Sequence, residues 1–486
     1  MPADSRGAII AAPSSGAGKT TITLALLRAL RRKGVRVAGA KVGPDYIDPR
    51  FHERATGCPA FNLDPWAMSD GLLQHLFLQA GADRDLVLVE GVMGLFDAAS
   101  NGLGSTADLA VTLGLPAVLV VDVRGQGQSV AALVKGFRDH KPELVLGGII
   151  LNRVGSDVHL EMLQEALAPL DIPVLGGVPR DEKLHAPNRH LGLVQASERN
   201  DLDAFLETAA DKMEQHLDLE TLQEICTRPA FQPVRSQVAG ELPNPPGQRV
   251  AIAQDVCFSF VYPHLLQHWR SSGAELTFFS PLDNEVPDPA SDAVYLPGGY
   301  PELHAERLSQ ADRFRLGMTA VVERGAFVYG ECGGYMTLGK LLTDARGQEF
   351  PMLGFLPLHT SFETPRLHLG YRRLHACRTL PFWQDTSDEL TAHEFHYAQT
   401  LALGPADSYS RCGMPAVGTV DRKAWFPGTW LGPSCTSLVA AGIERGISHQ
   451  MKGSIVPIVV VLFEIYSSLW LFMKILADRA KESVSW

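Results

Sequence analysis

The chain has 486 residues, too many for a single hydrophobic core, so two or three domains are expected. Its 45% hydrophobic and 20% charged residues are ordinary for a globular protein, and its net charge of −11 argues against a general nucleic-acid-binding protein. The seven cysteines are scattered without a CxxC pair, which indicates neither a disulfide framework nor a zinc site, and a reducing cytoplasm fits best. The N-terminus lacks the apolar core of a signal peptide.

The first half of the chain alternates short apolar runs with amphipathic segments. Continuous apolar runs are typical of parallel strands that are covered on both faces. The alternation predicts a doubly wound α/β domain over residues 1–200. Strands are expected at 7–12, 35–41, 85–91, 116–122, 146–152 and 172–178.

The segment APSSGAGKTT (12–21) stands between a predicted strand and a predicted helix, which is the setting of a phosphate-binding loop. Backbone N–H groups at its glycines would hold phosphate oxygens, Lys19 would reach the outer phosphates, and the Thr20 hydroxyl would ligate Mg²⁺. Pro13 replaces the first glycine of the usual pattern, so the loop is a variant. The predicted nucleotide-binding residues here are Gly16, Gly18, Lys19, Thr20 and Thr21.

Polar residues follow several predicted strands at the edge of the sheet where the loop lies. Asp45 and Glu90 are the expected further metal ligands, because the carboxyl ends of parallel strands face one crevice. Asp48 and Asp97 are interpreted equally well as metal ligands or as ordinary acidic residues of a loop. Asn152 ends a later strand, where its amide would read a base edge of the nucleotide or serve as a turn residue.

The pattern changes after the first domain. Residues 201–248 read as a helix, near 201–217, followed by a proline-rich polar linker. The alternation of strands and helices then resumes and predicts a second α/β domain over residues 249–410. Its strands are expected at 249–255, 274–280, 292–299 and 325–331.

The segment GECGGYMTLG (330–339) places Cys332 at a sharp turn between a predicted strand and a predicted helix, as in a nucleophile elbow. A helix N-terminus would lower the pKa of this thiol and favour the thiolate. Gly298 and Gly299, which follow an earlier strand, would offer N–H groups to a tetrahedral oxyanion. The alternative for Cys332 is a buried structural thiol, and the other six cysteines keep that interpretation.

Taken together, these stretches resemble the cobyrinic acid a,c-diamide synthase family, especially its branch that acts on hydrogenobyrinic acid. The resemblance extends from Gly7 to about Leu403. It implies a synthetase domain related to dethiobiotin synthetase, followed by a flavodoxin-like class I glutamine amidotransferase domain. It also implies amidation of the a and c carboxylates of a corrin, through an acyl phosphate and ammonia released at Cys332. The matching stretches are APSSGAGKTT, KVGPDYIDPRFH, VEGVMGLFD, GIILNRVGSD, RHLGLVQA, VYLPGGYPELHA, GECGGYM, HLGYRR and TAHEFHYA.

The resemblance implies ATP, Mg²⁺, L-glutamine and a corrin as ligands of a cytoplasmic enzyme, and a homodimer is compatible with it. Arg189 and His190 would contact corrin carboxylates, whereas Arg372 and Arg373 are equally well interpreted as a solvated pair. One rival interpretation is cobyric acid synthase, which amidates other carboxylates of the same macrocycle. Another is a non-catalytic nucleotide-switch ATPase with a membrane tail.

Members of the family end with a strand of the form GSFxHL, whose histidine is the base partner of the cysteine, and this chain lacks it. His393, His396 and His449 are the remaining candidates for the base. The resemblance stops near residue 410, so we expect 411–486 to be an aberrant, out-of-frame tail and the glutaminase half to be impaired. The apolar stretch 455–473 leaves a membrane tail or a buried helix as alternatives.

Overall fold

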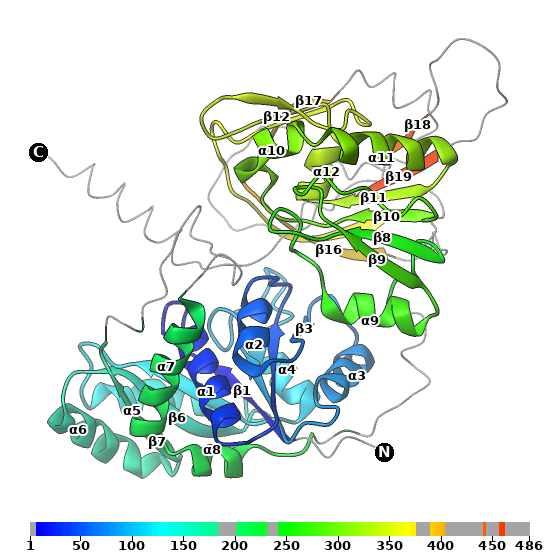
Figure 1. Ribbon diagram of the computed structural model, residues 1–486. Coiled ribbons are helices and arrows are strands. Elements are labelled where there is room, and N and C mark those ends of the chain that lie inside the picture. The colour runs from blue at the N-terminus through cyan, green and yellow to red at the C-terminus, as the bar shows by residue number, and fades with distance from the viewer. Residues whose placement is uncertain are drawn as a thin grey trace, which may run out of the picture. The chain divides into compact units, whose positions relative to one another are not determined.

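The computed structural model describes residues 6–181, 184, 201–229, 231, 242–375, 389–403, 441–443 and 456–461. These residues form two compact units, one within residues 6–231 and one within residues 242–461 (Figure 1). Each unit has its own sheet and its own core, so the two are described separately.

A parallel sheet of seven strands runs through the first unit, in the order β3-β2-β4-β1-β5-β6-β7. Every residue of β2 and β4 is buried, as expected of strands covered on both faces. The predicted doubly wound α/β fold is confirmed, with β3 as an additional short strand. The strands are β1 (Arg6–Ala11), β2 (Val37–Val42), β3 (Phe61–Leu63), β4 (Leu86–Glu90), β5 (Ala117–Asp122), β6 (Leu146–Val154) and β7 (Val174–Pro179).

Serine side chains begin several helices of this unit. Ser69, Ser105 and Ser156 each accept a hydrogen bond from a backbone N–H in the first turn, and Ser105 forms a reciprocal capping box with Asp108. The helices are α1 (Lys19–Arg32), α2 (Asp48–Thr56), α3 (Asp70–Ala80), α4 (Thr106–Leu113), α5 (Ser129–Asp139), α6 (Asp157–Leu167), η1 (Ala168–Leu170), α7 (Leu202–His216) and α8 (Leu219–Ile225).

Helix α7, near the start of the segment expected to be helix and linker, packs against α1 of the first unit. Leu206 and Met213 on its inner face are completely buried in the same core as α1. On its outer face Asp203 and Asp211 form ion pairs of 2.8 and 2.7 Å with arginines of α1. Helix α7 is therefore part of the first unit's core.

The second unit has a six-stranded sheet in the order β18-β19-β11-β10-β8-β9. All of its neighbouring pairs are parallel except β18 with β19. The strands are β8 (Arg249–Ala253), β9 (Glu275–Phe279), β10 (Ala293–Leu296), β11 (Phe327–Glu331), β18 (Ala441–Ile443) and β19 (Val456–Val461). The helices are α9 (Pro263–Ser271), η5 (Pro301–Leu303), α10 (Ala305–Ser309), α11 (Asp312–Arg324) and α12 (Gly333–Leu338).

Alternate residues of this sheet enter two different cores. Val294 and Leu296 of β10 pack with α11 and α12, whereas Tyr295 packs with Trp269 of α9. Helices therefore cover both faces of the sheet (Figure 1). The second domain is an α/β domain as predicted.

Two smaller sheets complete the second unit. One has the order β13-β12-β14-β17, and the other is the antiparallel pair of β15 and β16. Their strands are β12 (Leu341–Thr343), β13 (Glu349–Pro351), β14 (Leu358–Ser361), β15 (His368–His375), β16 (Glu389–His396) and β17 (Gln399–Leu403).

Two strands come from the C-terminal segment that was expected to be aberrant. Strand β19 lies parallel to β11, with Val459 opposite Tyr329. Strand β18 pairs with the other edge of β19. Within the apolar stretch 455–473, residues 456–461 thus form a strand. Among the described helices, none combines the length and the apolar character needed to cross a membrane. An out-of-frame origin of residues 411–486 stays a prediction.

Candidate functional site

The predicted phosphate loop lies between β1 and α1. Gly18, just before α1, has φ 98°, and a Cβ there would lie 2.3 Å from Nδ2 of Asn152. Asn152, at the end of β6, donates a hydrogen bond of 2.8 Å to the Ala17 carbonyl. Glycine at position 18 therefore permits both the left-handed turn and the contact that holds the loop. Gly16 also has a positive φ, of 79°.

Helix α1 opens with the residues expected at the phosphates and the metal. Lys19 is 8% exposed and donates a hydrogen bond to the Met93 carbonyl. Burial, and then the positive charge of Lys41, lower the pKa of Lys19 to about 8. The Thr20 hydroxyl lies 2.5 Å from Oε1 of Glu90, and Thr21 donates to the Leu184 carbonyl at 3.5 Å.

Glu90, at the end of β4, is the centre of a buried charged cluster. Its Oε1 lies 2.8 Å from Nζ of Lys41, and its Oε2 lies 2.7 Å from Nε2 of His52. Burial alone would raise the pKa of Glu90, but Lys41 and His52 outweigh burial and lower it. Four elements, α1, β2, α2 and β4, thus bring their side chains to one carboxylate.

Asp48 extends the cluster, because its Oδ2 lies 2.6 Å from Nζ of Lys41. Burial opposes the charge on Lys41, but Asp48 and then Glu90 raise the pKa of that lysine. The carboxylate of Asp45 accepts hydrogen bonds from the backbone of Ile47 and Asp48, at 2.8 and 3.3 Å. Burial and the charge of Asp48 raise the pKa of Asp45. Asp97 lies apart in the loop after β4, where its carboxylate accepts from the Gly94 N–H at 2.7 Å.

The oxygens near the loop are of the kind that Mg²⁺ prefers. Adjacent ligands of an octahedral Mg²⁺ lie roughly 3 Å apart, so a bound ion would replace the hydrogen bond of 2.5 Å that Thr20 donates to Glu90. Both Glu90 oxygens also face Lys41 and His52, so a metal at Glu90 would share that carboxylate with them. The side-chain oxygens of Thr20, Glu90 and Asp45 therefore fit a magnesium site in ligand chemistry.

Two residues of this cluster, Lys41 and His52, were not singled out from the sequence. Both lie in the quoted stretch KVGPDYIDPRFH, and the signal was a lysine next to the end of an otherwise apolar strand. Lys41 and Glu90 are register partners on neighbouring strands although they are 49 residues apart. The contact depends on β2 and β4 being adjacent, which the sequence did not reveal.

Cys332 lies in a strained turn between β11 and α12. Its φ is 44° and its ψ is −108°, an unusual conformation for a residue with a side chain, and the residue is 2% exposed. A Cβ at Gly334 would lie 1.9 Å from the Leu296 carbonyl oxygen, so glycine is required there for β10 and α12 to approach. This geometry is that of the predicted nucleophile elbow.

The two glycines predicted to bind an oxyanion follow β10. Gly299 has φ 157°, and a Cβ on it would lie 1.8 Å from the Cys257 carbonyl oxygen. A Cβ built on Gly333 would lie 3.1 Å from the Gly299 nitrogen, so this N–H is beside the elbow. The carbonyl of Gly298 accepts from the Phe260 N–H at 3.1 Å.

The candidate bases His393 and His396 both lie on β16, in the two-stranded sheet with β15, whereas Cys332 follows β11 of the six-stranded sheet. His393 is 5% exposed and packs edge-on against Tyr371. Nε2 of His396 lies 3.2 Å from Oε1 of Glu394, as expected from strand alternation. The assignment of either histidine as the base stays a prediction.

The side chains of the other five predicted residues lie outside the described part of the chain. Arg189, His190 and His449 lie outside the described residues. Arg372 and Arg373 belong to β15, opposite Ala392 and Thr391, and only their backbone is described.

Comparison with known proteins tests the interpretation as a whole. The family model of the CobQ/CobB/MinD/ParA nucleotide binding domain matches residues 8–194, and that of the CobB/CobQ-like glutamine amidotransferase domain matches residues 249–428. The hydrogenobyrinate a,c-diamide synthase of Brucella suis biovar 1 (strain 1330) is 54% identical over 407 residues, which cover 84% of this chain and 92% of that protein. The chain belongs to the hydrogenobyrinate a,c-diamide synthase family.

Two further relatives carry the same name. The protein of Sinorhizobium sp is 52% identical over 401 residues, covering 82% of this chain and 91% of that protein. The protein of Agrobacterium fabrum (strain C58 / ATCC 33970) is 46% identical over 432 residues, covering 87% of this chain and 98% of that protein. Membership of the hydrogenobyrinate a,c-diamide synthase family confirms the resemblance drawn from the sequence.

Proposed function

We propose that this chain converts the a and c carboxylates of hydrogenobyrinic acid to amides in cobalamin biosynthesis, using ATP and glutamine. The observation that carries the proposal is a pairing within one chain. A phosphate loop backed by the Glu90 cluster lies in the unit that matches a nucleotide-binding family. A cysteine in a strained elbow lies in the unit that matches a glutamine amidotransferase family.

The first half-reaction activates the corrin. A carboxylate is a poor acyl donor because its oxygen leaves badly, so a carboxylate oxygen attacks the γ-phosphorus of ATP and ADP leaves. Lys19 contributes positive charge to the transferring phosphoryl group. Mg²⁺, for which Thr20, Glu90 and Asp45 are the proposed ligands, supplies neutralising charge and alignment when bound. Lys41 and His52 hold the Glu90 carboxylate in position.

The second half-reaction supplies nitrogen. The Cys332 thiolate attacks the side-chain amide carbon of glutamine, the oxyanion develops near the Gly299 N–H, and collapse releases ammonia and leaves a thioester. Water then hydrolyses the thioester to glutamate. Ammonia attacks the acyl phosphate carbon, and phosphate leaves. His393 and His396 are the proposed candidates for the group that takes the thiol proton.

Several finer assignments belong to the same proposal. Arg189 and His190 would bind carboxylates of the corrin, because a polyanionic substrate requires cations. Mg²⁺ is the proposed metal, the cytoplasm the proposed location, and a homodimer a compatible assembly. The location and the assembly are not needed for the reaction sequence above.

The test uses the full chain with hydrogenobyrinic acid, ATP and Mg²⁺, and compares glutamine with ammonium salts as nitrogen source. We expect two successive replacements of a carboxylate by an amide, followed by mass spectrometry and located at a and c by NMR. Amidation at other carboxylates would instead support the cobyric acid synthase alternative. Failure with both nitrogen sources would overturn the proposal. Amidation with ammonium alone would show that the glutaminase half is impaired.

A further inference from the structure

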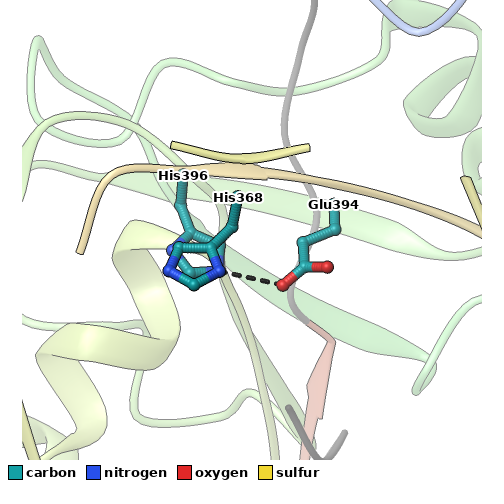
Figure 2. A group of neighbouring side chains, drawn as sticks. All are labelled: His368, Glu394 and His396. Carbon is teal, nitrogen blue, oxygen red and sulfur yellow. Dashed lines mark hydrogen bonds and ion pairs between the residues drawn. The ribbon is translucent and has the colours of Figure 1, made fainter. Parts of the chain in front are cut away.

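A cluster of potential metal ligands lies on the hairpin of β15 and β16 in the second unit. His368 and His396 are opposite each other in the antiparallel register, with ring centroids 4.6 Å apart and 15° between the ring planes. Glu394 lies two residues before His396 on the same face of β16. Figure 2 shows the two imidazoles stacked, with the Glu394 carboxylate beside their nitrogens.

The ligand atoms of this cluster converge. One nitrogen from each histidine and one Glu394 oxygen all lie within 4.8 Å of one another. The ligand atoms of a tetrahedral zinc ion lie roughly 3.3 Å apart, given Zn–N and Zn–O bonds of about 2.0–2.2 Å. Small side-chain rotations would bring the three groups to one ion, and the partial exposure of both histidines permits them.

Both ring nitrogens of His396 face oxygen atoms. Nδ1 lies 3.0 Å from the Ala398 carbonyl oxygen, and Nε2 lies 3.2 Å from the Glu394 carboxylate. When Nδ1 donates its proton to the Ala398 carbonyl, Nε2 is the nitrogen available to a cation beside Glu394. A carbonyl that orients a histidine through its other nitrogen is a common feature of metal sites.

The donor set indicates the kind of metal. Two imidazoles and one carboxylate match the ligand set of zinc, whereas Mg²⁺ prefers oxygen ligands alone.

We propose that His368, Glu394 and His396 bind a zinc ion that joins β15 to β16. Three protein ligands leave a fourth position for water or another small ligand. Coordination through Nε2 would remove His396 from the candidate bases for Cys332 and leave His393 and His449. This site is separate from the magnesium site proposed at the phosphate loop and does not depend on the proposed amidation.

The experiment titrates the metal-stripped full chain with Co²⁺ and then with Zn²⁺, in excess Mg²⁺ to occupy the phosphate-loop site. A Cys332→Ser background removes the elbow thiol as a ligand. We expect one equivalent of Co²⁺ with the visible absorption of a four- or five-coordinate site, no thiolate charge-transfer band, and displacement by one equivalent of Zn²⁺. No stoichiometric binding, or a thiolate band, would overturn the proposal.

Variants locate the site. His368→Gln, Glu394→Gln and His396→Gln should each weaken zinc binding by at least about tenfold, the lower end of what loss of an outer-shell partner costs. His359→Gln, on β14 of the same unit, is the matched control and should bind as the parent does. If all three ligand variants bound zinc as tightly as the parent chain does, the proposal would be overturned. If the variants misfold, the cobalt spectrum of the parent chain still decides it.

Discussion

Nε2 of His52 lies 2.7 Å from Oε2 of Glu90, and both side chains are completely buried. Their approach depends on Gly39 of β2, where a Cβ would lie 2.8 Å from that of His52. His52 occupies one oxygen of Glu90, while Thr20 and Lys41 face the other. The carboxylate is thereby held from both sides at the edge of the phosphate loop.

Glu90→Gln should therefore destabilise the first unit at neutral pH by about 3–5 kcal/mol, because it breaks a buried charged network. The pKa of Glu90 is lowered in the fold, so its contribution is fully present above the unfolded value of 4.5 and is lost as the pH falls below it. Denaturant unfolding across this pH range would measure the effect. Glu53→Gln, on the surface of α2, should change the unfolding free energy by less than about 0.5 kcal/mol. If the difference in unfolding free energy between the parent and Glu90→Gln grew as the pH falls, Glu90 would not be the stabilising carboxylate.

ATP binding should take up a proton near pH 8. Burial and Lys41 lower the pKa of Lys19 to about 8, so Lys19 is partly neutral there without nucleotide, and phosphate charge would raise its pKa. Calorimetry in buffers of different ionisation enthalpy would detect the uptake. The effect should vanish in Lys19→Arg, because arginine stays charged. Uptake that persists in that variant would assign the proton to another group.

Cys332→Ser should lower whatever glutamine-dependent amidation the parent chain has by at least about 100-fold, and should leave amidation with ammonium salts within about twofold. The thiol belongs to the unit that releases nitrogen and not to the phosphate loop. Steady-state rates with the two nitrogen sources would measure the split. The control is Cys58→Ser, whose hydroxyl can take over the thiol's contacts to Thr56 and Val37. Equal loss with both nitrogen sources would rule out the division of roles.

Gly299→Ala should destabilise the second unit by at least about 3 kcal/mol, since a Cβ 1.8 Å from the Cys257 carbonyl oxygen forces the backbone apart. Glutamine hydrolysis should fall with it. The matched change Gly136→Ala, in α5, meets no atom within 4 Å and should stabilise its helix by about 0.5–1 kcal/mol. Thermal unfolding of both variants would test this. Full glutaminase activity in Gly299→Ala would refute the close packing.

The position of α7 predicts where the first unit can be cut. A fragment that ends at residue 200 would expose the face of α1 that Leu206 and Met213 cover, so it should aggregate. A fragment that ends at residue 229 keeps α7 and α8 and should fold and bind ATP. Light scattering and nucleotide binding would distinguish the two. If the fragment ending at residue 200 also stayed monomeric and bound ATP, α7 would be dispensable for folding of the first unit.

Sequence reasoning recovered the features that are local in the chain. Runs such as 85–91 became buried strands because continuous apolar residues carry that signal by themselves. The turns around Gly18 and Cys332 also followed from motifs within a few residues. Strand β3 escaped prediction because its three residues are too few to show a period.

Features that depend on pairing between distant segments could not be predicted. Lys41 meets Glu90 because β2 lies beside β4, and His368 meets His396 because β15 and β16 pair in one particular register. Neither strand order nor register is written in local composition. Helix α7 likewise looked separable in sequence, because its apolar face reveals its partner only when α1 is in place.

The backbone of Cys332 has a consequence for how this position would evolve. At φ 44° and ψ −108° any side chain is strained, by about 1–3 kcal/mol, and glycine alone would relax the turn. A lineage no longer selected for glutamine use would gain robustness by exchanging this cysteine for glycine. The thiol therefore stands at a position where the backbone itself favours glycine.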